Sequence, residues 1–114
     1  MFDEWFGNTQ KIDRITERTG DEQAVIDGQT ALMSLYHYET CMFCARVRNT
    51  IRLLNLSIKT RDIHLDPDHL QDLIANGGKP TVPCLRIDSA ADSTSTWLYE
   101  SEDIRSFLMQ KFGQ

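Results

Sequence analysis

The sequence predicts an α/β domain in which a mixed four-stranded sheet is flanked by helices. Apolar residues alternate between strand-like and helix-like spacing from residue 31 onward. A chain of 114 residues also suits one domain with a single core. The expected order of elements is β-α-β-α-β-β-α. The first strand and the first helix meet at Cys41-x-x-Cys44, and we expect the chemistry at that junction.

Residues 1–30 are expected to form an extension before the domain, which covers residues 31–114. The apolar residues of the extension have loosely helical spacing and are Phe2, Trp5, Phe6, Ile12 and Ile15. Gly20 interrupts the pattern, and residues 21–26 could add another turn. One interpretation is a helix laid on the outside of the domain. The other is a docking arm for a partner or a membrane surface, which the acidic balance of the segment disfavours.

A strand, a helix and a second strand are expected at the start of the domain. The first strand lies within residues 31–38, and the helix runs from about Cys44 to Leu54. The second strand covers residues 57–63. This order implies a parallel pair of strands with a right-handed crossover. The core face of the helix carries Cys44, Val47, Ile51 and Leu54.

A second helix, a hairpin and a final helix follow. Asp66-Pro67 supplies an N-cap and a proline at the first helical position, and Gly77-Gly78 ends the helix. Residues 82–87 and 96–99 are typical of an antiparallel hairpin with a long polar turn. Ser101 is expected to cap the final helix. The core face of that helix carries Ile104, Phe107, Leu108 and Phe112.

The position of the Cys41-x-x-Cys44 pair predicts its reactivity. The first turn of a helix has unpaired N–H groups and a partial positive charge, and both favour a thiolate over a thiol. We therefore expect Cys41 to be an exposed, acidic attacking sulfur. Cys44 points inward with the core face and is expected to be a shielded resolving sulfur. A solvated, positively charged helix face is expected from Arg46, Arg48 and Arg52.

The bond between Val82 and Pro83 could be cis, because proline lowers the cost of that isomer. A cis bond would turn the Val82 backbone toward an extended peptide lying over Cys41. The alternative is an ordinary trans proline at a strand start, which is the usual state of an isolated bond of this kind. The presence of the cysteine pair favours cis. Cys84, which follows, is expected to be a small buried hydrophobic residue.

Three motifs in this order resemble glutaredoxins: Cys41-x-x-Cys44, Thr81-Val82-Pro83 and Tyr99-Glu100-Ser101-Glu102-Asp103-Ile104. The last motif is also similar to the Glu-Ser-x-x-Ile of glutathione transferase N-terminal domains. The resemblance covers roughly residues 31–112. It implies a thioredoxin-like fold, a cis Pro83 and a glutathione groove between the three motifs.

By this resemblance, the chain is a glutathione-dependent thiol-disulfide oxidoreductase with Cys41 and Cys44 as its catalytic residues. Glutathione would be the co-substrate, and protein disulfides or glutathionylated proteins would be the substrates. The backbone at Val82-Pro83 would pair with glutathione, and Glu100-Ser101 would hold its γ-glutamyl end.

The sequence departs from the glutaredoxin pattern next to these motifs. Met42 and Phe43 replace the proline and tyrosine usual in the dithiol class. Tyr38 stands where many glutaredoxins have a lysine that meets the glycine carboxylate of glutathione. We therefore expect Tyr38 in the glutathione site, with Lys79 or an arginine of the first helix supplying the charge.

Other functions stay open at this point. Two protomers could share a [2Fe-2S] cluster through Cys41 and two glutathiones, because loss of the proline after the first cysteine, here Met42, is associated with cluster-binding glutaredoxins. A thioredoxin-like interaction domain with idle cysteines is a further alternative. A structural zinc on Cys41, Cys44, His64 and His69 is disfavoured, since a predicted helix and strand separate the two pairs. No other metal is expected.

Composition excludes several classes of partner. The formal net charge is -5, which makes nucleic acid an unexpected partner. No apolar run approaches the roughly 20 residues of a membrane span. Three cysteines are an odd count, which is poorly suited to a disulfide-stapled secreted domain. We expect a cytoplasmic monomer that binds neither nucleic acid nor membranes.

Overall fold

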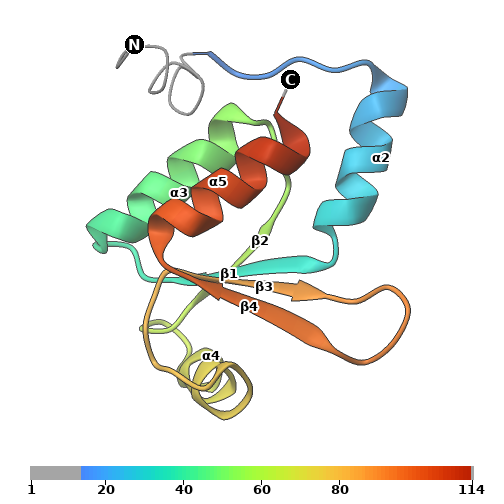
Figure 1. Cartoon of the computed structure of the whole chain (residues 1–114). Coiled ribbons are helices and arrows are strands. Elements are labelled where there is room, and N and C mark those ends of the chain that lie inside the picture. Colours follow the sequence, from blue (N-terminus) through green and yellow to red (C-terminus); the bar gives the residue numbers. More distant parts are fainter. Residues whose placement is uncertain (1–13, 114) are drawn as a thin grey trace.

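The computed structural model describes residues 14–113. Its strands are β1 (Met33–His37), β2 (Lys59–Asp62), β3 (Cys84–Asp88) and β4 (Ser95–Tyr99). Its helices are α2 (Gly20–Thr30), α3 (Met42–Leu53), α4 (Pro67–Asp72) and α5 (Ser101–Phe112), with a π-helical turn, η1 (Leu73–Gly77), continuing α4. The sheet forms the middle layer, α3 and α5 lie side by side on one face, and α4 lies on the other (Figure 1).

The strand order in the sheet is β2-β1-β3-β4. β1 runs parallel to β2 and antiparallel to β3, and β3 runs antiparallel to β4. The order of elements and the mixed sheet are those expected from the sequence. The arrangement is thioredoxin-like, which confirms the fold that the resemblance implied.

Several elements begin or end away from their expected positions. α3 begins at Met42, two residues early, because Cys41 itself serves as the N-cap. β2 is shorter than residues 57–63, since it is an edge strand that pairs only with β1, over four residues. β3 begins after Pro83, which has no N–H to donate to a neighbouring strand.

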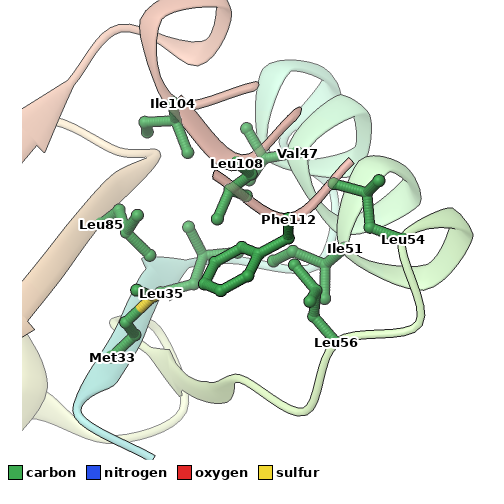
Figure 2. Close-up of a cluster of buried hydrophobic side chains, with 10 residues drawn as sticks. All are labelled: Met33, Leu35, Val47, Ile51, Leu54, Leu56, Leu85, Ile104, Leu108 and Phe112. Carbon is green, nitrogen blue, oxygen red and sulfur yellow. The ribbon is translucent and has the colours of Figure 1, made fainter. Parts of the chain in front are cut away.

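The main core lies between the sheet and the pair α3 and α5 (Figure 2). The expected helical faces are confirmed: in α3 and at its end, Cys44, Val47, Ile51 and Leu54 are all buried. In α5, Ile104, Leu108 and Phe112 are buried, and Phe107 is partly buried against them. All five residues of β1 are buried, because helices cover both faces of this central strand.

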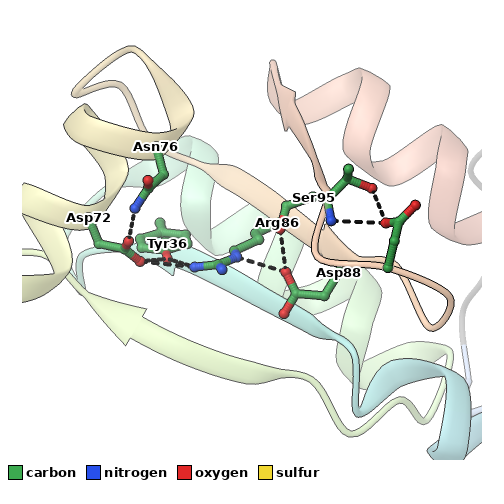
Figure 3. A network of polar contacts seen from close by, with 8 residues as sticks. Tyr36, Asp72, Asn76, Arg86, Asp88 and Ser95 are labelled. Carbon is green, nitrogen blue, oxygen red and sulfur yellow. Dashed lines mark hydrogen bonds and ion pairs between the residues drawn. The ribbon is translucent and has the colours of Figure 1, made fainter.

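On the opposite face, a polar network joins the end of α4 to the sheet (Figure 3). The Asp72 carboxylate accepts hydrogen bonds from the Tyr36 hydroxyl and from Nη1 of Arg86, the latter at 3.0 Å. Arg86 Nε also donates to Asp88 Oδ1 at 2.8 Å. Partial burial opposes ionisation of Asp72, but the hydrogen bonds from Tyr36 and Asn76 and the charge of Arg86 lower its pKa. The carboxylate therefore stays charged and fixes α4 against the sheet.

Helix α2 precedes the sheet and begins with a capping box. The Glu22 N–H donates to the Thr19 hydroxyl, and the Thr19 N–H donates to the Glu22 carboxylate. Gly20 thus opens this helix and does not interrupt it, contrary to the sequence prediction. The aromatic residues expected to shape the extension lie outside the described residues, and the division of the chain at residue 30 stays a prediction. Among residues 14–113, no helix is long and apolar enough to cross a bilayer.

Arg18 ties the segment before α2 to the ends of two core helices. Its Nη1 donates to the Leu54 carbonyl at 2.8 Å, at the end of α3. Its Nη2 donates to the Phe112 carbonyl at 2.9 Å, at the end of α5. The last carbonyls of a helix have no partner within the helix and carry partial negative charge, so a guanidinium satisfies both ends at once. This segment is therefore part of the folded unit.

Replacing Arg18 by Ala should lower the free energy of unfolding by about 1 kcal/mol, because two helix ends lose a charged donor. Chemical denaturation measures this change. Arg14→Ala is the matched control, since Arg14 is an exposed arginine four residues earlier. Equal stability of the two variants would contradict the role of Arg18 as a double C-cap.

Candidate active site

The strand register brings three sequence motifs together at the same end of the strands. Tyr36 pairs with Cys84, and Cys84 pairs with Tyr99, so these residues form one row across β1, β3 and β4. β1 and β4 run toward this end of the sheet, and β3 runs away from it. The segment leading to Cys41, the Val82-Pro83 bond and Glu100-Ser101 therefore all lie just beyond one row of paired residues.

Cys41 is the N-cap of α3, and its sulfur faces the start of its own helix. The backbone N–H of Cys44 donates to Cys41 Sγ at 3.3 Å. The sulfur therefore lies beside the unpaired N–H groups of the first helical turn. The arrangement is the one expected for an attacking sulfur.

Accessibility of the cysteine pair differs in part from the prediction. Cys44 is fully buried, and burial, followed by the hydrogen bond with Cys41, raises the pKa of its thiol well above the ordinary value. Cys41 is only 9% exposed, so the prediction that this sulfur is exposed is wrong. Its side chain folds back onto the helix start, while Met42 and Phe43 project outward and are 76% and 57% exposed. Cys41 still has some accessible area, and Cys44 has none.

Three arginines were expected on a solvated face of α3, and two of them are exposed while Arg48 is not. Arg46 is exposed and forms an ion pair with Glu102 of α5 at 3.6 Å. Arg52 is exposed and binds Asn49. Arg48 is partly buried and donates to the backbone that precedes Cys41. The acceptors in that backbone are the carbonyls of Tyr38 and Glu39.

Two of the predicted glutathione residues have aromatic partners. The Tyr38 ring stacks on His64, with 4.1 Å between the ring centroids. Lys79 Nζ lies 5.0 Å from the centroid of the Tyr99 ring, and the Tyr99 hydroxyl donates to the Lys79 carbonyl at 3.2 Å. Lys79 is thereby held beside the end of β4 with its charge exposed. Tyr38 has no charge to offer a carboxylate, but its hydroxyl can donate to one.

The bond between Val82 and Pro83 is cis, as the sequence predicted. Val82 is partly exposed and packs on the core cluster formed by Tyr36, Ile63, Leu73 and Cys84. Cys84 is fully buried, and burial raises the pKa of its thiol to about 11. This agrees with the prediction of a small buried hydrophobic residue.

Glu100 has a strained backbone at the start of α5. It is a non-glycine residue with φ 73° and ψ 116°, outside the regions that side chains readily adopt. Strain of this kind costs about 1–3 kcal/mol and is concentrated at functional sites. Glu100 is also the N-cap residue, and Ser101, which was expected to be the cap, is the first residue of the helix. The exposed carboxylate therefore stands next to the unpaired N–H groups of the first turn.

Metal ligands do not gather in the described part of the chain. Within residues 14–113, no group of three or more histidine, cysteine, aspartate or glutamate side chains is placed to hold a metal ion. His64 is stacked on Tyr38, and His69 lies 3.6 Å from the Asp66 carboxylate. The two histidines of the disfavoured zinc site thus have other partners.

Sequence reasoning missed two features of this site. The contact of Tyr38 with His64 joins the loops after β1 and β2, and the parallel pairing of these strands was the signal that could have predicted it. The strain at Glu100 had no sequence signal, since glutamate is not a residue that favours positive φ.

The chain matches a known protein family. The family of glutathione S-transferase N-terminal domains matches residues 35–114, which is most of the chain and includes all three motifs. A comparison with curated proteins found no match.

Several solved structures share the fold. An epsilon-class glutathione S-transferase from the housefly Musca domestica is 19% identical over 72% of this chain, with a TM-score of 0.57. Glutathione transferase F7 from Populus trichocarpa is 22% identical over 70%, with a TM-score of 0.55. A maleylacetoacetate isomerase from Anaeromyxobacter dehalogenans, solved with bound glutathione, is 24% identical over 72%, with a TM-score of 0.54. The chain covers only 36% of each of the first two proteins and 38% of the third.

Proposed function

The chain belongs to the family of glutathione S-transferase N-terminal domains, and we propose that it binds glutathione and performs thiol-disulfide exchange through Cys41. Substrates would be glutathionylated proteins or protein disulfides. A cytoplasmic location suits this activity, because a reducing compartment supplies glutathione and keeps thiols reduced.

One observation carries the proposal: Cys41 Sγ accepts a backbone N–H at the start of α3. A transferase or isomerase of the same fold would act on the sulfur of glutathione and would not require a protein thiolate at this point. Here the second cysteine of the pair lies one helical turn away, with a sulfur that burial keeps protonated. An attacking sulfur and a nearby resolving sulfur are the arrangement that disulfide exchange needs.

The proposed reaction proceeds in two exchanges. The Cys41 thiolate attacks the glutathione sulfur of a mixed disulfide, a new bond joins Cys41 to glutathione, and the protein thiol leaves as a thiolate that takes a proton from water. A second glutathione thiolate then attacks the glutathione sulfur bound to Cys41. Oxidised glutathione leaves, and the Cys41 thiolate is regenerated. With a protein disulfide as substrate, Cys44 would resolve the intermediate.

Glutathione would lie across the three motifs at this end of the strands. Its cysteinyl backbone would pair with Val82, as the resemblance implies. Its γ-glutamyl end carries an ammonium and a carboxylate, which suit the Glu100 carboxylate and the first N–H groups of α5. The exposed charge of Lys79 would meet the glycine carboxylate.

Reduction of a glutathionylated protein, coupled to oxidation of glutathione, tests the proposal in the intact chain. A visible spectrum of protein purified anaerobically with glutathione separates it from the alternative [2Fe-2S] carrier, which would use the same Cys41. Activity of colourless protein supports the oxidoreductase. Cluster absorbance without activity, or transferase activity without disulfide reduction, would contradict it.

Replacing Cys41 by Ser should reduce the activity with glutathionylated substrate to the uncatalysed background, while Cys44→Ser should retain much of it. Only the first sulfur attacks in the route that uses a single thiol. Steady-state rates measure the difference, and thermal midpoints verify that both variants are folded. Equal losses in the two variants would show the assignment of the cysteines to be wrong.

Glu100→Ala should raise KM for the glutathionylated substrate about ten-fold and change kcat much less. The carboxylate would hold an end of glutathione that does not react, and a charge-assisted hydrogen bond contributes about 1.5 kcal/mol. Alanine keeps the strained backbone position, so only the carboxylate is removed. Asp103→Ala, which removes another exposed carboxylate from the same helical turn, is the control. Similar KM values for both variants and the unmodified chain would contradict the proposed groove.

A further inference from the structure

The guanidinium of Arg48 binds three consecutive residues at the end of β1 and just after it, which are His37, Tyr38 and Glu39. Its Nη1 lies 2.9 Å from His37 Nδ1 and donates to the Tyr38 carbonyl at 3.3 Å. Its Nη2 donates to the Glu39 carbonyl at 3.0 Å. One side chain of α3 therefore fixes the backbone that leads from the central strand to the reactive sulfur.

The Tyr38 carbonyl connects this clamp directly to Cys41. It accepts the Cys41 N–H at 3.2 Å as well as the bond from Arg48. On the other side, the Cys41 carbonyl accepts the Ala45 N–H at 3.0 Å. Cys41 is thus held from both sides, and the side that faces the strand depends on Arg48.

His37 completes the arrangement as a neutral acceptor. It is buried, and burial, followed by the charge of Arg48, lowers the pKa of its imidazole. An unprotonated Nδ1 can accept a hydrogen bond from the guanidinium, with the ring proton on the other nitrogen. Three acceptors on residues 37–39 thus engage three of the five N–H donors of Arg48.

From this geometry we propose that Arg48 is a positioning residue for Cys41. The inference rests on the proposed function and deepens it by assigning a residue that acts through residues 37–39 without touching the substrate. The role requires a planar fork that reaches several acceptors at once. Lysine carries the same charge but presents it at a single point.

The test compares Arg48→Ala and Arg48→Lys with Arg52→Ala, which removes an exposed arginine of the same helix that donates to the Asn49 side chain. Two quantities are measured: kcat and KM with a glutathionylated protein, and the rate at which iodoacetamide alkylates Cys41 in a Cys84→Ala background. Mass spectrometry identifies the alkylated cysteine. Thermal midpoints report folding.

Arg48→Ala is expected to lower kcat roughly ten-fold with KM unchanged within two-fold, because a misplaced nucleophile slows the reaction without weakening binding. The alkylation rate should fall with kcat. Arg48→Lys should recover the thermal midpoint but not kcat, and Arg52→Ala should match the unmodified chain.

Wild-type kcat in Arg48→Ala, or full recovery of kcat in Arg48→Lys, would overturn the proposal, since charge alone would then suffice. A rise in KM without a change in kcat would overturn it as well, because Arg48 would then be a binding residue. The alkylation rate needs no glutathione, so it separates this inference from the proposed function. An alkylation rate in Arg48→Ala equal to that of the unmodified chain would reject the positioning role of Arg48. Absence of disulfide reduction by the unmodified chain would instead reject the proposed function.

Discussion

The register of β1, β3 and β4 is the constraint on which the site depends. On the face toward α3 and α5, Leu35 pairs with Leu85, and Leu85 pairs with Leu98. A slip of one residue would turn these apolar side chains to the opposite face, so burial of the core fixes the pairing. The same register places the loop before Cys41, the cis proline and the start of α5 at one end of the strands. Burial of the core side chains therefore also fixes the positions of the segments that form the candidate site.

Much of this architecture could be predicted from local patterns in the sequence. Helical spacing of Val47, Ile51 and Leu54 identified the buried face of α3, because burial of an amphipathic helix follows directly from its period. The cis bond at Pro83 was predicted because proline preceded a strand in a chain that also carries a cysteine pair. These features depend on residues close in sequence or on a motif whose members appear in a fixed order.

Features that depend on contacts between distant backbone groups could not be predicted in this way. The clamp by Arg48 requires three acceptors to point at one helix position, and nothing in the sequence around Arg48 distinguishes it from Arg46. The low exposure of Cys41 follows from its N-cap bond, which turns the sulfur toward its own helix. The positive φ at Glu100 arises where β4 must turn directly into α5. In each case the tertiary arrangement decided the outcome.

The most direct test of this account is a crystal structure of the Cys44→Ser variant trapped as a mixed disulfide with glutathione. The account predicts a disulfide on Cys41, with the cysteinyl backbone of glutathione paired with Val82 and the γ-glutamyl end between Glu100 and the start of α5. A disulfide on Cys84, or glutathione that contacts neither Val82 nor Glu100, would contradict it.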